Sequence, residues 1–391
     1  MIDISLHAYM AEILAHTPTS FHRYLYDKIS WENRLVGITG PRGIGKSTMI
    51  QQHLLEHRQQ HTALYVSADH IYFSSNKLVD LADNFVKEGG THLYIDEVHT
   101  YKGWSRELKQ IYDTHPSLSV IFTGSSILDI KEGEADLSRR ALMYHMQGLS
   151  FREYLEINHG ISSPSYNLEE ILSHKVSLPE LPHPLPVFRE YLRNGYYPFA
   201  LNGNFEQRML QVISQTVESD IPKYADMKMS TARKLKQMLY IVSTLAPYKP
   251  NLQNLATEIG ASKNNIPDYF YYLEQAGMIS QLRDDTSGLR GLGKVEKVYI
   301  DNPSLMTVLA GGVPDIGNIR ETFFYNQMRV NNNVVSSRAS DFSISQYTFE
   351  IGGQKKGKKQ IDQIPNGIVV RDDIEIGYGI FIPLWHFGFN Y

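Results

Sequence analysis

The run from Gly40 to Ser47 carries residue types that bind phosphate. It reads Gly-Pro-Arg-Gly-Ile-Gly-Lys-Ser, which is the P-loop pattern. Its glycines let backbone N–H groups surround an anion, and the N-terminus of a following helix adds positive charge. Lys46 would reach the β- and γ-phosphates, and the Ser47 hydroxyl would ligate Mg²⁺. We therefore predict a site for ATP and Mg²⁺ whose binding residues are Gly40, Pro41, Arg42, Gly43, Ile44, Gly45, Lys46, Ser47 and Thr48.

Two adjacent carboxylates, Asp96 and Glu97, follow the apolar run Leu93-Tyr94-Ile95. Asp96, at a strand end, would hold Mg²⁺ directly or through water, and Glu97 would polarise the attacking water. The alternative is a pair of solvated acids in a loop. Glu97 is the feature that separates a hydrolase from a protein that only binds nucleotide.

Three further residues are candidates around the γ-phosphate. Ser125 follows a predicted strand in the run Thr123-Gly124-Ser125-Ser126, and its hydroxyl could bind the phosphate or its water. Arg139 and Arg140 could supply an arginine finger, in cis or from a neighbouring subunit. The alternatives are an ordinary strand-to-loop turn and a pair of surface arginines. The predicted catalytic residues are thus Lys46, Glu97, Arg139 and Arg140.

These residues must be positioned by a parallel sheet. Short apolar runs predict buried strands at 35–39, 63–67, 92–96 and 119–123, and a helix from about 47 to 61 follows the P-loop. Strands that alternate with helices indicate an α/β fold.

Three histidines, His53, His57 and His61, are spaced by four along the predicted helix after the P-loop. Two histidines at this spacing can bind one metal ion. We favour the alternative, in which all three are exposed polar side chains on a solvated face.

Composition limits the class of protein. The 391 residues suggest two to three domains, and 38 basic against 42 acidic residues give a net charge of −4. A generally basic nucleic-acid coat is therefore excluded. With no cysteine, a disulfide scaffold and a thiol nucleophile are excluded too. We expect a cytoplasmic protein without a signal peptide, and no apolar stretch approaches the roughly 20 residues of a membrane span.

Residues 231–305 indicate a helix-turn-helix followed by a two-stranded wing. Asn251 would cap a helix over 252–259 that Gly260 ends, and Ser262 would cap the next. Lys263 stands where a DNA-recognition helix would begin. The many aromatic residues of that helix favour packing against other domains instead.

Several motifs together resemble one family. The stretches 40–48, 94–97 with His99 and Trp104, and 122–126 are similar to prokaryotic AAA-plus ATPases of the archaeal-ATPase and STAND-related branch. The run 148–155 resembles the stretch that follows the core in that branch. Gly195-Tyr196-Tyr197-Pro198 resembles its lid element, which implies that Pro198 lies near the nucleotide base.

This resemblance implies the domain plan. The expected fold class is α/β, a P-loop NTPase of the AAA-plus kind with a parallel sheet core, helical lid, winged helix and small α/β C-terminal domain. The expected boundaries are a helical leader at 1–30, the ATPase core at 31–150, the lid with its Pro-containing linker at 151–230, the winged helix at 231–305, and a domain resembling PD-(D/E)xK nucleases at 306–391.

An active nuclease would need a metal-binding acidic set and a lysine. Glu321, Asp341 and Glu350 could gather a divalent metal, but the position two residues after Glu350 is Gly352. Lys355 or Lys356 would have to substitute from a displaced position. We favour a degenerate domain kept for packing or partner binding. The same lysines, with Lys358 and Lys359, form a basic loop that could contact phosphate or simply be solvated.

We therefore predict a Mg-dependent ATPase that couples its nucleotide state to C-terminal domains. One alternative is an ATP-bound switch or scaffold with little turnover, and another is an ATP-regulated DNA nuclease. The expected partners are ATP, DNA through the winged helix or lysine loop, a second copy of the chain and an unknown protein. No membrane is expected as a partner.

Overall fold

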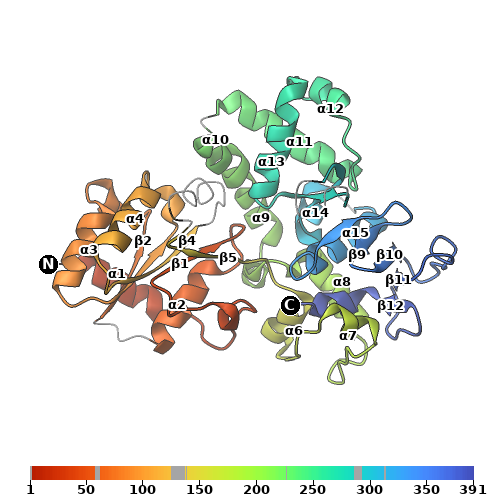
Figure 1. Cartoon of the computed structure of the whole chain (residues 1–391), viewed down its shortest axis with the longest axis horizontal. Coiled ribbons are helices and arrows are strands. Elements are labelled where there is room, and N and C mark those ends of the chain that lie inside the picture. The colour runs from red at the N-terminus through yellow and green to blue at the C-terminus, as the bar shows by residue number, and fades with distance from the viewer. Residues whose placement is uncertain are drawn as a thin grey trace. The chain divides into compact units, whose positions relative to one another are not determined.

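Two compact units make up the chain. The computed structural model describes residues 2–57, 62–124, 137, 139–225, 227–285, 293–311 and 314–391. The first unit is Met1–Gly148 and the second is Leu149–Tyr391; Figure 1 shows the elements of each.

A five-stranded parallel sheet forms the centre of the first unit. Its order is β2-β3-β4-β1-β5, with every neighbouring pair parallel. The strands are β1 Leu35–Thr39, β2 Ala63–Ser67, β3 His92–Asp96, β4 Ser119–Gly124 and β5 Leu142–His145. The first four match the predicted strands and confirm the α/β P-loop fold class. The sequence did not indicate β5, an edge strand whose side chains are partly or largely exposed.

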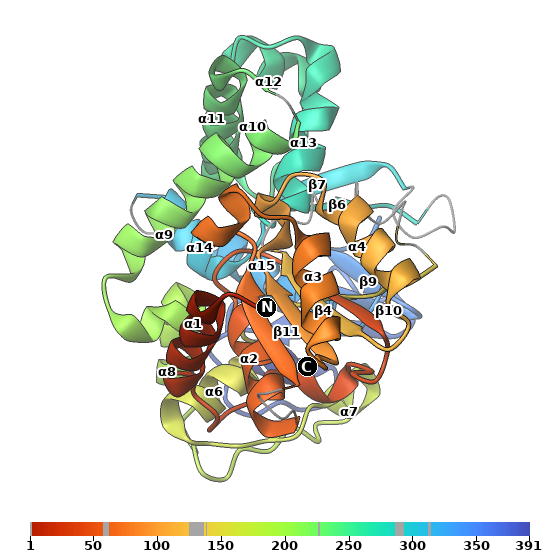
Figure 2. The same cartoon turned by 90° about the vertical axis from the view of Figure 1, so that its left-hand side faces the viewer.

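Helices cover both faces of this sheet. They are α1 Ile4–Ala15, α2 Lys46–His57, α3 Leu78–Lys87 and α4 Trp104–Thr114, with short 3-10 helices η1 Tyr26–Lys28, η2 Ile71–Ser74 and η3 Val98–Thr100. Helix α2 lies on one face, and α3 and α4 lie on the other (Figure 2). Strands β1 and β2 are buried along their whole length because helices cover the sheet on both sides.

The second unit begins with a helical region. Its helices are α6 Phe151–His159, α7 Leu168–Leu172, α8 Leu185–Glu190, η4 Tyr191–Gly195, η5 Pro198–Asn202, α9 Phe205–Gln215, η6 Thr216–Asp220, α10 Ile221–Tyr224 and α11 Met229–Leu245. Among the described residues, no helix has the length and apolar character that crossing a bilayer requires.

A helix pair and a two-stranded ribbon follow. They comprise α12 Leu252–Glu258, η7 Lys263–Asn265, α13 Ile266–Gln275, β6 Ile279–Arg283 and β7 Val295–Ile300. The predicted cap is confirmed, because the Asn251 side chain accepts a hydrogen bond from the Asn254 amide. Strands β6 and β7 pair in antiparallel fashion. A winged helix remains our interpretation of this arrangement.

A mixed sheet closes the chain. Its order is β12-β11-β10-β9-β8. After α14 Pro303–Leu309 and α15 Ile316–Met328 come β8 Val334–Ser336, β9 Phe342–Ile344, β10 Tyr347–Gly352, β11 Gly367–Arg371, β12 Phe381–Pro383 and η8 Leu384–Phe389.

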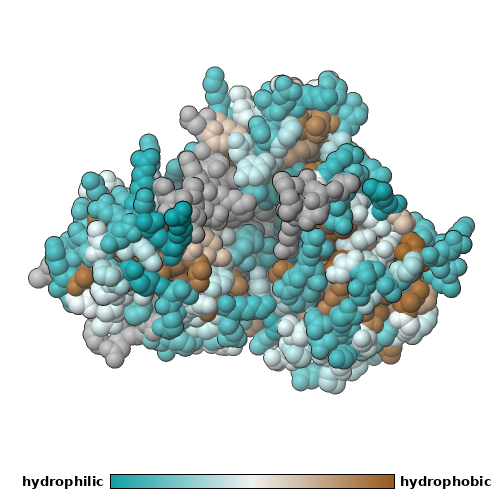
Figure 3. All heavy atoms as spheres, viewed as in Figure 1, coloured by the Kyte–Doolittle hydropathy of each residue, from teal (hydrophilic) through white to brown (hydrophobic). Residues whose placement is uncertain are grey.

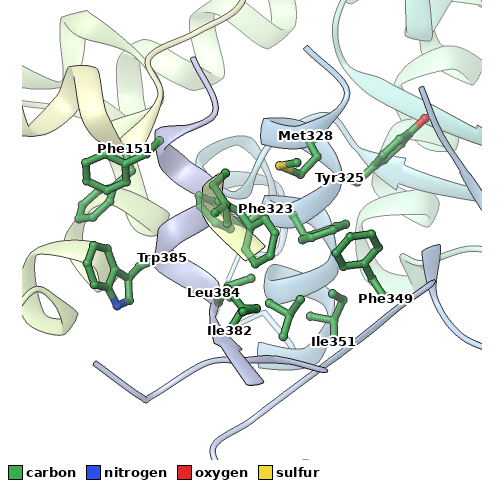
Figure 4. Close-up of a cluster of buried hydrophobic side chains, with 14 of the residues drawn as sticks. Phe151, Phe323, Tyr325, Met328, Phe349, Ile351, Ile382, Leu384 and Trp385 are labelled. Atoms are coloured by element: carbon green, nitrogen blue, oxygen red, sulfur yellow. The ribbon is translucent and has the colours of Figure 1, made fainter. Parts of the chain in front are cut away.

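One hydrophobic core joins the two ends of the second unit. Phe151 of α6 and Phe188 of α8 belong to the same buried cluster as Phe323, Phe349 and Trp385, and Figure 4 shows part of it. Residues 151–192 and 323–389, which we expected in separate domains, therefore share a core.

Candidate active site

The loop between β1 and α2 has the backbone that a phosphate cradle requires. Gly40 adopts a φ of +148°, and a Cβ there would collide with the main-chain oxygen of Met146. Gly45 adopts a φ of +96°, which side chains rarely tolerate. The loop leads directly into α2, which begins at Lys46, so the N-terminal amides of that helix lie at the same place.

Lys46 is folded back over this loop. Its side chain is buried, and Nζ donates to the main-chain oxygens of Gly40 at 2.9 Å and Pro41 at 2.7 Å. Burial lowers the pKa of Lys46 to about 8, although Glu97 and Asp96 act in the opposite direction. A buried ammonium with neutral carbonyl partners is a charge that an anionic phosphate would stabilise.

Asp96 ends β3 as a buried carboxylate with several donors. Oδ2 accepts from the Tyr65 hydroxyl at 2.8 Å, and Oδ1 accepts from the Thr123 hydroxyl and from the Glu97 amide. Burial, followed by the neighbouring Glu97, raises the pKa of Asp96, whereas a side-chain hydrogen bond with Ser47 opposes this rise. The structure thus brings together the two residues predicted to ligate Mg²⁺, Ser47 and Asp96.

Ser47 and Asp96 have side chains that suit a Mg²⁺ site next to bound phosphates. Mg²⁺ is commonly held by one or two protein oxygens while water and substrate phosphates complete the octahedron. A hydroxyl and a carboxylate at the mouth of a phosphate loop provide that donor set. Among the described residues, no group of three or more His, Asp or Glu side chains could hold a metal ion.

Glu97 has a strained backbone and charged neighbours. Its φ of 52° and ψ of 39° are left-handed, which costs of order 1 kcal/mol for such a residue. Its Oε2 lies 3.5 Å from His99 Nε2 and 4.0 Å from Arg42 Nη2. Glu97 therefore stands next to Asp96 with its carboxylate directed toward an arginine of the P-loop.

Both predicted arginines lie near the end of the strands opposite to the P-loop. They immediately precede β5, whose first residue pairs with Val36 near the start of β1, whereas the P-loop follows the end of β1. A five-residue strand spans about 13 Å or more. Arg140 also forms a two-pronged ion pair with Asp113, with N–O distances of 2.9 and 3.0 Å. This geometry does not support a finger role in cis for Arg139 or Arg140.

Two other predicted residues cannot be placed at this site. Ser125 lies outside the described residues. Pro198 opens η5 in the second unit, so its place near the base remains a prediction. Thr123, two residues before Ser125, donates its hydroxyl hydrogen to Asp96.

The prediction that all three histidines after the P-loop are exposed is wrong for His53. Its ring is buried, stacks on Trp31 with centroids 4.1 Å apart, and its Nδ1 lies 2.8 Å from the Tyr94 hydroxyl. His57 is exposed as expected, and His61 lies outside the described residues.

Sequence reasoning missed two residues that support the site. Tyr65 of β2 fixes Asp96, and Arg23, from the segment before β1, donates to the Ile44 main-chain oxygen within the P-loop. A tyrosine within a buried strand hints at a polar partner, because a buried hydroxyl needs one. Nothing in the sequence around Arg23 indicates its partner.

Fold and site define a class of protein. A parallel sheet in this order, with a P-loop after the first strand and an acidic pair at the end of β3, is that of a P-loop nucleoside triphosphatase. Residues 32–155 match the family model described as an AAA domain. The first unit therefore has the fold of a P-loop nucleoside triphosphatase, and most of it is similar to an AAA domain. Residues 185–315 match a second model, "Domain of unknown function (DUF8612)".

Comparison with known proteins gives distant similarities. The uncharacterized protein MJ1637 of Methanocaldococcus jannaschii is 25% identical over 447 residues, covering 98% of this chain and 93% of that protein. The Walker-type ATPase PABY2304 of Pyrococcus abyssi is 12% identical, with a TM-score of 0.40 over 79% of this chain and 96% of that one. AMPPCP-bound DnaA from Aquifex aeolicus is 13% identical, with a TM-score of 0.26 over 70% and 90%.

A second charged cluster lies within the second unit. Lys297 Nζ is 3.2 Å from Glu321 and 3.7 Å from Asp341, and burial raises the pKa of Asp341 to about 6, helped by Glu321 and Glu350. Lys356 Nζ pairs with Glu350. A Cβ added at Gly352 would lie 2.6 Å from the Lys356 side chain, which therefore occupies the space that a side chain at 352 would take.

Proposed function

We propose that the chain hydrolyses ATP in its first unit. The observation that carries this proposal is the convergence of Lys46, Ser47 and Asp96 at the P-loop, with Glu97 beside them. In our proposal the loop amides and Lys46 bind the phosphates. Ser47 and Asp96 would hold Mg²⁺, which supplies neutralisation of phosphate charge when bound. Glu97 would orient and deprotonate the attacking water.

The surroundings of Glu97 support a controlled reaction. Arg42 and His99 flank its carboxylate, and Arg42 belongs to the loop that would receive the phosphates. An incoming γ-phosphate would compete with Glu97 for the Arg42 guanidinium, since both are anions. Release of Arg42 would then free the Glu97 carboxylate for water.

Coupling to the second unit is part of the proposal. Arg23 joins the P-loop oxygen of Ile44 to the main-chain oxygens of Gln147 and Gly148, the last two residues of the first unit. A loop movement on nucleotide binding would therefore reach the chain where the second unit begins. Equal proteolytic protection of residues 200–391 with and without nucleotide would contradict this coupling.

The decisive experiment compares ATP binding and steady-state hydrolysis. We expect turnover by the wild type, loss of binding in Lys46→Ala, and binding without turnover in Glu97→Gln. Lys87→Ala and Glu12→Gln make the same chemical changes at exposed positions of the first unit and should match the wild type. ATP binding without turnover by the wild type would favour the switch or scaffold and would remove the catalytic role from Glu97.

A second candidate function, an ATP-regulated DNA nuclease, rests on Lys356. Its side chain fills the place of the missing lysine at 352 and reaches Glu350. Against this, Lys297 already pairs with Glu321 and Asp341, two of the carboxylates that would have to bind the metal. Plasmid cleavage with Mg²⁺ or Mn²⁺, with and without ATP, tests the idea. Cleavage lost in Lys356→Ala but kept in Lys359→Ala would support it, and no cleavage under any condition would exclude it.

DNA contact, self-assembly and a protein partner remain predictions. Within the lysine loop, Lys356 pairs with Glu350 and Lys358 pairs with Asp362, so acidic side chains neutralise part of its charge. DNA binding with a steep salt dependence would support phosphate contacts.

A further inference from the structure

A chain of hydrogen bonds leads from the N-terminal leader, residues 1–30, to the carboxylate of Asp96. The Tyr65 hydroxyl donates to Asp96 Oδ2 at 2.8 Å, and Gln51 Nε2 lies 2.9 Å from the oxygen of that hydroxyl. Thr17 Oγ1 in turn lies 3.2 Å from Gln51 Oε1. Thr17 follows α1, Gln51 lies in α2 and Tyr65 lies in β2. Residues from separate parts of the first unit therefore converge on one carboxylate of the predicted Mg²⁺ site.

Chemistry fixes the direction of each hydrogen bond in this chain. Burial and the neighbouring Asp96 raise the pKa of Tyr65, so the hydroxyl keeps its one hydrogen and donates it to the carboxylate. The hydroxyl oxygen then accepts, and of the two polar atoms of the Gln51 amide only the nitrogen can donate. Gln51 Oε1 therefore faces Thr17, whose hydroxyl shares its hydrogen between this atom and the Ile13 carbonyl oxygen. Every donor in the chain points toward Asp96.

Gln51 strengthens the last hydrogen bond of the chain. A hydroxyl that accepts a hydrogen bond donates a stronger one, because neighbouring bonds polarise each other. With the amide nitrogen of Gln51 on one side of the Tyr65 hydroxyl, the hydroxyl hydrogen is directed to the acceptor on the other side, which is Asp96. Gln51 thus acts on the carboxylate through Tyr65.

Helix α1 restrains Tyr65 itself. This helix packs against β2, and the main-chain amide of Tyr65 donates to Met10 Sδ at 3.3 Å. The ring of Tyr9 lies 20° from parallel to the Tyr65 ring, with centroids 6.2 Å apart. Tyr65 is only 2% exposed. The leader therefore holds this tyrosine in two ways, directly through α1 and indirectly through Thr17 and Gln51.

We propose that Gln51 is a positioning residue of the ATP site, and that the leader acts through Gln51 and Tyr65 on the affinity of Asp96 for Mg²⁺. This inference rests on the ATPase function proposed above and deepens it. Removing a side chain that orients a metal ligand from outside the coordination shell typically costs about 10- to 100-fold in metal affinity or activity. Gln51 lies one hydrogen bond further out than Tyr65, so its removal should have a smaller effect.

The leader is not part of the similarity to the AAA domain. Thr17 and α1 precede residues 32–155, which match that model, whereas Gln51 and Tyr65 lie within them. The connection to Asp96 therefore comes from the contacts of this chain and does not follow from the family similarity. In our proposal the leader adds a point of control to the P-loop site.

The test measures ATP affinity as a function of Mg²⁺ concentration, because this quantity does not require turnover. Gln51→Met removes the amide and keeps a side chain of similar length. We expect the Mg²⁺ concentration that gives half of the full gain in ATP affinity to rise about three- to fivefold. ATP affinity in EDTA should stay unchanged. The matched control is Gln110→Met, at an exposed position of α4 in a unit whose surface is mostly hydrophilic (Figure 3), and it should match the wild type.

A double-mutant comparison asks whether Gln51 acts through Tyr65. In the Tyr65→Phe background, Gln51→Met should cause no further rise, because the hydroxyl that it orients is gone. Equal rises in both backgrounds would reveal an independent effect of Gln51 and would overturn the proposal.

Thr17→Val tests the part played by the leader. This change removes the hydroxyl and keeps the shape of the side chain, so the Mg²⁺ requirement should rise less than in Gln51→Met. In the Gln51→Met background it should not rise at all. An unchanged Mg²⁺ requirement in Thr17→Val would remove the leader from the proposal. Thermal unfolding of each variant sets a temperature at which all samples are folded, so that loss of folded protein is not mistaken for weaker metal binding.

The outcomes separate this inference from the proposed function. A wild type that hydrolyses ATP, with the same Mg²⁺ dependence in Gln51→Met, would overturn the positioning role and leave the ATPase proposal intact. A shifted Mg²⁺ dependence in a protein that binds ATP without turnover would support the positioning role and contradict hydrolysis. Wild-type ATP affinity that does not respond to Mg²⁺ would overturn both the positioning role and the predicted Mg²⁺ site.

Discussion

The guanidinium of Arg23 donates a hydrogen bond to the main-chain oxygen of Ile44, inside the phosphate-binding loop. Its second nitrogen donates to Gln147 and Gly148 at 2.7 Å each. One buried cation therefore binds main-chain oxygens of both the loop and residues 147–148. This links the position of Ile44 to that of Gly148. Arg23 thus supports the phosphate-binding loop through the main-chain oxygen of Ile44.

Replacing Arg23 should weaken both folding and nucleotide binding. Arg23→Met leaves several buried carbonyl oxygens without a donor, at a cost of about 2–4 kcal/mol in the free energy of unfolding. We also expect a lower ATP affinity, because the loop loses its support. Thermal unfolding and ATP titration of the same samples measure both effects. Arg106→Met, at an exposed position, is the control, and unchanged ATP affinity in folded Arg23→Met would contradict the supporting role.

Tyr65 should act through Asp96. Tyr65→Phe removes one of the donors to that carboxylate, so Asp96 would be held less firmly. We expect the Mg²⁺ concentration for half-maximal ATPase activity to rise about three- to tenfold, with a smaller change in kcat. The lost hydrogen bond to a charged group would cost about 1.5–3 kcal/mol of stability. Tyr240→Phe, at an exposed position of α11, should change neither the Mg²⁺ dependence nor the stability. A loss of kcat without any shift in Mg²⁺ dependence would contradict this role.

The sequence predicted those parts of the first unit that local patterns specify. Strands buried on both faces read as continuous apolar runs, so β1 to β4 could be located. The P-loop and the acidic pair after β3 are contiguous motifs. Strand β5 could not be located, because it forms an edge whose exposed residues lack such a run.

Contacts between distant segments could not be predicted. His53 looks like a solvated helix residue in sequence, yet Trp31 covers its ring. Arg23 and Gly148 are 125 residues apart. The position of Arg140 could not be predicted for the same reason, because only the pairing of β5 with β1 shows that β5 begins at the end of the strands opposite to the P-loop.

ATP affinity should depend on the charge of Lys46. Its pKa is lowered to about 8 in the free protein, and a bound triphosphate would raise it. The charged form binds, so affinity should be nearly constant below pH 7 and fall about tenfold between pH 7 and pH 9. At pH 8, binding should take up about half a proton, measured by calorimetry in buffers of different ionisation enthalpy. Lys46→Arg keeps its charge over this range, so any binding that it retains should be independent of pH; proton release on wild-type binding would refute the assignment.

The carboxylates Glu321, Asp341 and Glu350 of the second unit should reduce the free energy of unfolding near neutral pH. Burial and two neighbouring carboxylates raise the pKa of Asp341 from its ordinary value of 3.8 to about 6. Between these values the folded state binds more protons than the unfolded one, so stability falls as pH rises from about 4 to 6. Asp341→Asn keeps an acceptor for the Ile351 amide and should therefore stabilise the protein at pH 7 by about 1–3 kcal/mol. Thermal unfolding from pH 4 to pH 7 measures this gain, which should vanish near pH 4, and Asp362→Asn on the exposed lysine loop is the control.

A stabilised but otherwise unchanged Asp341→Asn would mark Asp341 as a dispensable carboxylate. Loss of metal-dependent DNA cleavage in the same variant would instead assign Asp341 a function that accounts for the stability it sacrifices.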